Sequence, residues 1–143
     1  MTGWRVGYLT CPEYVMDRLL LLSAAEIAAV PTFVQDAALE ALKTDPAPMR
    51  LVYERRRKFV TARLREMGLS FPEPEGAFYV FVDIRKFGLD SAAFCTRMIR
   101  EARVAAVPGS CFGSEGYIRL SYCCSDADLK KGLDRMAEFV KSL

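Results

Sequence analysis

Residues 107–125 read Val-Pro-Gly-Ser-Cys-Phe-Gly-Ser-Glu-Gly-Tyr-Ile-Arg-Leu-Ser-Tyr-Cys-Cys-Ser. The glycines Gly109, Gly113 and Gly116 make an open loop whose backbone can turn or approach another group closely. Residues 117–122 are rich in aromatic and aliphatic side chains, so we expect them to form a strand that carries Arg119. A guanidinium held by a strand is a rigid bidentate hydrogen-bond donor that suits a carboxylate. A strand with one face in water would leave the same arginine solvated.

The segments on either side of this loop alternate between strand and helix patterns. We expect a buried strand over 77–84, a helix from Ser91, as its N-cap, to about residue 103, and a short strand over 104–107. After the Arg119 strand, a final helix is expected from Asp126, as its cap, to about Lys141. This order predicts a small α/β layer, a sheet of a few strands covered by helices.

The first half of the chain is predicted to be mainly helical. Helices are expected over about 12–23, 32–42 and 49–67, with Gly68 as the C-cap of the last and a loop over 44–48. Residues 1–10 have the pattern of a strand that begins abruptly, and with the first helix they do not fit the α/β unit. We therefore expect two parts, a remnant of another domain at 1–29 and a domain at 30–143 that includes the long connecting helix.

The composition is that of a soluble globular protein. The chain has 143 residues, 52% of them hydrophobic, and a net charge of +2, which favours neither a nucleic-acid nor a membrane partner. The basic run 55–58 is expected to be a solvated helix face. The five cysteines form no CxxC pair and histidine is absent, so we expect no metal site and no histidine acid–base chemistry. The odd cysteine count and the lack of an apolar leader predict a cytoplasmic protein.

Four segments, in this order, resemble signatures of the class I/II aminotransferases, the fold-type I enzymes that use pyridoxal 5′-phosphate. The segment 1–8 resembles the one just after the cofactor lysine, and 53–57 resembles the Tyr-x-x-Arg-Arg-Asp helix motif. The segment 74–79 resembles the Pro-x-Gly-x-Phe-Tyr strand, and 107–121 resembles the loop and strand of the substrate carboxylate site. The resemblance implies that 1–29 is a remnant of the large cofactor-binding domain and 30–143 is the small C-terminal domain.

Two functional residues follow from the resemblance by position. Arg5 matches the family arginine that binds the cofactor phosphate, and Arg119 matches the family arginine that pairs with the substrate α-carboxylate. Phe78 could line the same pocket, but packing on a buried strand is the favoured role. The implied reaction moves an amino group between an amino acid and a 2-oxo acid, in a parent protein that is a homodimer.

The chain also departs from the family pattern. The Schiff-base lysine of the family lies a few residues before the position of Met1, and the first lysine of this chain is Lys43. No catalytic residue is therefore expected within the chain, which we predict to be inactive and not to bind pyridoxal 5′-phosphate tightly. Lys58 stands where the family often has Asp. Arg103 stands where it often has Gly, which suggests a different turn.

Two other functions stay open at this point. Some transcription regulators resemble this family and use an aminotransferase-like domain to sense the cofactor or an amino acid; an upstream winged-helix segment would identify one. A purely structural domain without a ligand would instead leave Arg119 exposed and unpaired. The substrate amino acid does not follow from the sequence.

Overall fold

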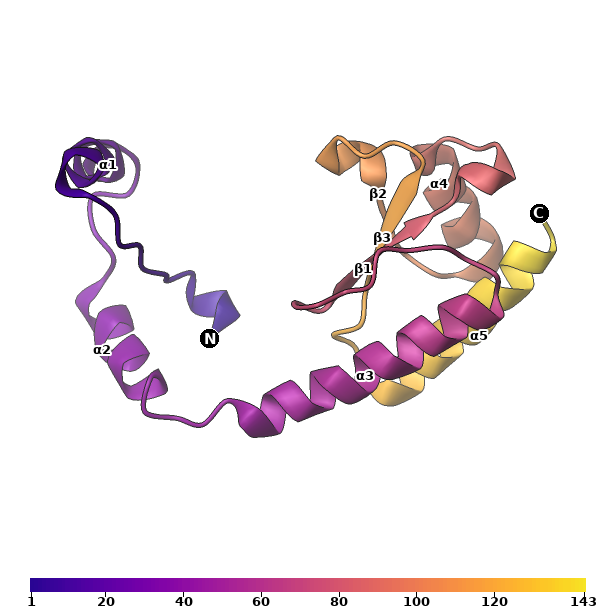
Figure 1. Cartoon of the computed structure of the whole chain (residues 1–143), viewed down its shortest axis with the longest axis horizontal. Helices are drawn as coiled ribbons and strands as arrows, with labels where there is room; N and C mark the ends of the chain where they lie inside the picture. The colour runs from indigo at the N-terminus through magenta and orange to yellow at the C-terminus, as the bar shows by residue number, and fades with distance from the viewer. The chain divides into compact units, whose positions relative to one another are not determined.

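The computed structural model describes residues 1–143, apart from the side chain of Thr2. The chain folds as two compact units, Met1–Pro46 and Ala47–Leu143 (Figure 1). Of the helices that the structure describes, none is long and apolar enough to cross a membrane.

The first unit consists of helices joined by irregular segments. These are the 3-10 helix η1 (Thr2–Trp4) and the α-helices α1 (Glu13–Glu26) and α2 (Thr32–Ala41). The strand expected over 1–10 does not form, and residues 5–12 have no regular structure. A strand is stable only where a neighbouring strand takes its backbone N–H and C=O groups, and the described part of this unit provides no such neighbour.

The second unit is built on a three-stranded antiparallel sheet. Its strands are β1 (Tyr79–Asp83), β2 (Val107–Pro108) and β3 (Tyr117–Ser121), in the order β1-β3-β2. Strand β3 is central and places Arg119 between Phe81 of β1 and Val107 of β2. The expected strand at 104–107 is thus shorter and lies later, because only residues 107 and 108 are paired with β3.

Three helices cover one face of this sheet: α3 (Ala47–Glu66), α4 (Ser91–Ala102) and α5 (Asp126–Lys141). Alternate residues of β1 and β3 are buried against them, namely Val80, Val82, Ile118 and Leu120. The helices contribute most of the remaining core, including Leu64, Phe94, Met98, Leu133 and Met136. The prediction of a few-stranded sheet covered by helices is confirmed. The face that carries Tyr79, Phe81 and Arg119 is opposite this core and is half-buried.

Helices α3 and α5 lie side by side and run in the same direction (Figure 1). Arg56 donates to Asp126 at 2.6 Å, and Arg63, two turns further along α3, donates to Asp134 at 2.7 Å. The run 55–58 is therefore not a uniformly solvated face, since the Arg56 side chain is only 17% exposed and Arg57 donates to the Pro74 carbonyl. Asp126 lies near these arginines because the core brings the start of α5 against α3.

The helix ends correct three predictions. Asp90, not Ser91, is the N-cap of α4, and its carboxylate accepts from the amide of Ala93 at 2.7 Å. Ser125, not Asp126, caps α5. In both cases the cap is the residue whose side-chain oxygen reaches the amide three positions on. Helix α3 begins at Ala47, two residues early, because proline is tolerated in a first helical turn.

Arg103 ends α4 in a left-handed conformation, with φ 58° and ψ 37°. This is the conformation in which a glycine usually ends a helix, so the arginine does not change the turn. Gly68, predicted as the C-cap of α3, lies two residues after Glu66 and has the left-handed conformation expected at such a helix end, with φ 65°.

Candidate functional site

Arg119 lies at the middle of the central strand, on the sheet face that the helices leave uncovered. Its neighbours Ile118 and Leu120 are buried in the core, and Arg119 itself is half-buried. The alternation arises because successive residues of a strand point to opposite faces. Pairing with β1 on one side and β2 on the other fixes the backbone of Arg119 from both edges.

Two aromatic rings cover the guanidinium of Arg119. Its Cζ atom lies 4.3 Å from the ring centroid of Tyr79 and 4.3 Å from that of Phe112. Phe112 belongs to the 3-10 helix η3 (Gly109–Phe112), and its ring also meets that of Phe81 edge-on, with centroids 5.6 Å apart. The Arg119 backbone is paired within the sheet, but no hydrogen bond or ion pair joins its guanidinium to another described residue. The cation is thus held by rings, and its N–H groups are available to an anion.

Asp83, on the same face as Arg119, is bound by another arginine. Arg85, in the 3-10 helix η2 (Arg85–Phe87), donates to both oxygens of Asp83, with Nε 3.0 and 3.1 Å from them. These hydrogen bonds hold the pKa of Asp83 below its ordinary value, so the carboxylate is ionised and already paired. Arg85 also lies over the ring of Tyr117, 5.3 Å from its centroid.

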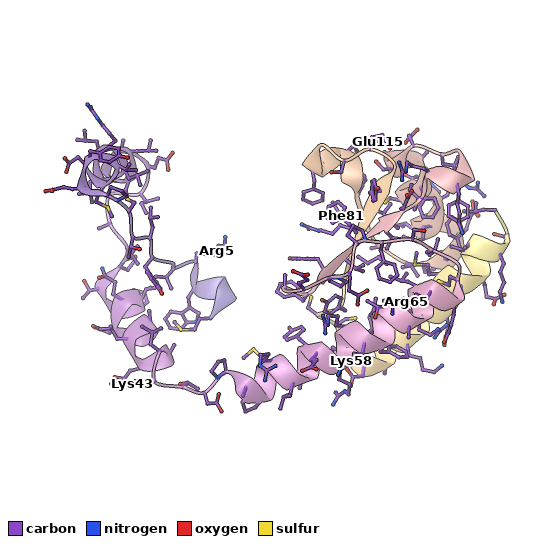
Figure 2. The ribbon with its side chains drawn as sticks, viewed as in Figure 1. Arg5, Lys43, Lys58, Arg65, Phe81 and Glu115 are labelled. Atoms are coloured by element: carbon purple, nitrogen blue, oxygen red, sulfur yellow. The ribbon has the colours of Figure 1, made fainter. Side chains whose placement is uncertain are left out.

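Glu115, labelled in Figure 2, anchors the loop that carries Phe112 to the start of α4. The carboxylate accepts from the amide of Gly116 at 2.8 Å, the amide of Ser91 at 2.6 Å and the Ser91 hydroxyl at 2.9 Å. These donors, that of Gly116 first, lower the pKa of Glu115. Ser91 is fully buried and also contacts the Ser110 hydroxyl at 3.2 Å.

The loop glycines have the roles that their spacing predicted. A Cβ at Gly109 would overlap the carbonyl oxygens of Ser114 and Tyr117, so only glycine permits this close approach. Gly116 adopts φ 81° where the loop enters β3, and a Cβ there would meet the side chain of Arg85. The turn that presents Phe112 is therefore closed by its own backbone.

The two arginines that the sequence singled out belong to different units. Arg5 directly follows η1 in the first unit, is exposed, and has a left-handed backbone with φ 53° (Figure 2). Arg119 belongs to the second unit. A planar guanidinium can bind either a phosphate or a carboxylate through two parallel hydrogen bonds. Phe78 packs against the core and its ring lies 4.4 Å from that of Tyr79.

Sequence reasoning missed the rings on Arg119 and the Glu115 anchor. The apolar run 77–84 suggested a strand buried on both faces, which hid that Tyr79 and Phe81 share the half-buried face with Arg119. Tyr79, Phe81 and Asp83 stand at every second position, and this alternation could have indicated that they share one face of the strand. Nothing in the sequence links Phe112 to Arg119, because the contact depends on the fold of the loop.

The chain belongs to the aminotransferase class I and II family, whose model matches residues 1–136. It is 43% identical to the aromatic-amino-acid aminotransferase 2 of Thermococcus litoralis over 99% of this chain and 38% of that protein. It is 42% identical to the aspartate aminotransferase of Thermotoga maritima, again over 99% of this chain and 37% of that protein. The chain thus spans little more than a third of the length of these relatives.

Solved structures of the family have the same fold. The aromatic aminotransferase of Pyrococcus horikoshii superposes with a TM-score of 0.89 at 43% identity, over 99% of this chain and 40% of that one. The aspartate aminotransferase of Thermotoga maritima superposes with a TM-score of 0.90 at 42% identity, over 99% of this chain and 37% of that one. The chain is therefore a fold-type I aminotransferase fragment, and these relatives do not favour the transcription-regulator alternative.

Proposed function

We propose that this chain is the C-terminal part of a pyridoxal 5′-phosphate-dependent aminotransferase, a cytoplasmic homodimer that acts on an amino acid and a 2-oxo acid. In this proposal residues 1–29 belong to the large cofactor-binding domain, and residues 30–143 form the small C-terminal domain. The observation that carries the proposal is Arg119, a half-buried cation on a central strand that no described carboxylate neutralises. Family membership over residues 1–136 supports the same reaction class.

Arg119 is proposed to bind the α-carboxylate that every amino-acid substrate carries. Because the strand fixes its backbone, the guanidinium can hold the substrate in one orientation relative to the reacting bond. Arg5 is proposed to bind the cofactor phosphate, for which its guanidinium has the appropriate charge and donors. Bound pyridoxal phosphate supplies the electron sink that makes transfer of the amino group feasible.

The chain on its own is proposed to be inactive and to hold the cofactor weakly. A lysine that serves as a covalent partner is usually desolvated or placed next to another cation. The described lysines are all exposed, and most are held by a carboxylate or a carbonyl: Lys43 by Glu40, Lys58 by Glu54, Lys86 by the Gly68 carbonyl, Lys130 by Asp134 and Lys141 by Glu138. None of them has the surroundings of a catalytic lysine.

The test compares Arg119→Lys with wild type in the longer protein that contains this chain. Lysine keeps the charge but loses the planar fork. A charge-assisted hydrogen bond contributes about 1.5–3 kcal/mol, so we expect kcat/KM for an amino acid to fall about tenfold to a hundredfold. The decarboxylated amine should be affected much less.

Arg135→Lys is the matched control, since Arg135 is an exposed arginine of α5. It should change neither specificity constant. Equal losses of kcat/KM for the amino acid and its amine in Arg119→Lys would show that Arg119 supports the fold and does not bind the carboxylate.

A further inference from the structure

Tyr79 and Phe112 cover the Arg119 guanidinium at the same centroid distance, 4.3 Å, and come from different elements, β1 and η3. We infer that these two rings are positioning residues, which present the edge of the Arg119 guanidinium to a carboxylate and exclude approach over its faces. This inference deepens the proposed function, on which its carboxylate role rests.

The physical basis is the shape of the guanidinium. All of its N–H groups lie in one plane, and a carboxylate forms two parallel hydrogen bonds only within that plane. An aromatic face attracts the cation electrostatically and displaces water from it. The two rings restrict the rotation of the guanidinium. Less side-chain entropy is then lost when a carboxylate forms two hydrogen bonds with it.

The protein keeps its own carboxylates away from this edge. Phe81 is opposite Arg119 in the register and Asp83 is opposite Tyr117, so Asp83 is a diagonal neighbour of Arg119 on the same face. Diagonal neighbours are within reach of a long side chain. Arg85, however, binds both Asp83 oxygens. The cation of Arg119 is consequently left for a carboxylate from outside the described residues.

Phe112 is exposed at 43%, yet its backbone is fixed. The close approach at Gly109 and the hydrogen bond from the Ser114 amide to the Gly109 carbonyl, 2.9 Å, close the turn around it. Glu115 then ties the end of the turn to Ser91 at the start of α4. The ring of Phe112 is therefore held over Arg119 by the loop and does not depend on burial.

The first test needs no activity. In the nitrogen-15-labelled 143-residue chain, the Nε–Hε resonance of Arg119 is assigned by its loss in Arg119→Lys. We expect it upfield of the resonance of the exposed Arg135, because protons over ring faces are shielded. Phe112→Leu and Tyr79→Leu should each move it towards the Arg135 position, whereas Phe112→Tyr and Tyr79→Phe, which keep the ring, should not.

Tyr117→Leu is the matched control, because Tyr117 lies on the same strand face and its ring contacts Arg85. It should leave the Arg119 resonance in place. An Arg119 resonance that neither leucine variant moves would overturn the inference, because the rings would not then cover the guanidinium.

The second test uses the complete aminotransferase. Phe112→Leu should lower kcat/KM for an amino acid about two- to tenfold, which is the range of a cation–π contact, and should spare the decarboxylated amine. Phe112→Tyr should restore the amino-acid value. Equal losses for the two substrates, or no loss, would refute the positioning role even where Arg119→Lys discriminates between them. If Arg119→Lys lowers kcat/KM equally for the amino acid and its amine, the proposed function and the carboxylate role are both wrong. The Arg119 Nε–Hε resonance of the first test still decides whether the rings cover the guanidinium.

Discussion

Replacing Arg103 by glycine is expected to stabilise the second unit. Arg103 ends α4 with φ 58° and ψ 37°, and its amide donates to the Ile99 carbonyl at 3.1 Å, so the cap itself is well formed. A residue with a Cβ is nevertheless disfavoured in this region, because the Cβ crowds the backbone. The side chain is exposed and forms no hydrogen bond or ion pair with another described residue, so little is lost with it.

The size of the effect follows from two opposing contributions. The left-handed conformation costs a residue with a Cβ about 1–2 kcal/mol. Glycine has more freedom in the unfolded chain, which opposes folding by about 0.5–1 kcal/mol. The midpoints of these ranges differ by about 0.75 kcal/mol, which is the expected gain in the free energy of unfolding. In a domain of this size about 1 kcal/mol shifts Tm by about 4–8 °C, so we expect a rise of about 3–6 °C.

Thermal and urea denaturation of the 143-residue chain measure this effect. The urea midpoint should rise with an unchanged slope, since the surface exposed on unfolding is the same. Arg100→Gly is the matched control, because Arg100 is an exposed arginine inside α4. It should lower the stability by about 1 kcal/mol, the helix-interior cost of glycine. If Arg103→Gly destabilises as much as Arg100→Gly, the left-handed cap is not strained and the reasoning is wrong.

Two further predictions concern the Glu115 anchor and the lysines. Because hydrogen bonds lower the pKa of Glu115, its contribution to stability should be fully present above its ordinary pKa of 4.5 and lost as pH falls through the lower folded pKa. Urea midpoints of wild type and Glu115→Gln should thus differ at neutral pH and converge in acid; a constant difference would argue against the anchor. After incubation of the 143-residue chain with pyridoxal phosphate and reduction with borohydride, we expect only scattered labelling of exposed lysines. A stoichiometric label on one lysine would contradict the proposed inactivity.

Local sequence patterns were sufficient for the helices of the second unit and for the central strand. Apolar residues at helical spacing predicted α3, α4 and α5 to within a few residues, because each helix buries one stripe against the sheet. The loop glycines predicted a turn or a close approach of the backbone, and a set of short signatures identified the family. Helical spacing, loop glycines and short motifs each involve residues that are close in the sequence. They can therefore be recognised without knowledge of long-range contacts.

Other features depended on partners distant in the sequence. The segment 1–10 has a strand pattern but forms no strand, because pairing needs a second chain segment beside it. Arg56 looked like a solvated arginine, yet it binds Asp126, 70 residues further on. Arg119 was chosen from its strand and the family resemblance, but the sequence did not reveal that Tyr79 and Phe112 cover it. Only the antiparallel register and the closed turn at Gly109 bring these rings together, because both contacts are set by packing and not by local conformational preference.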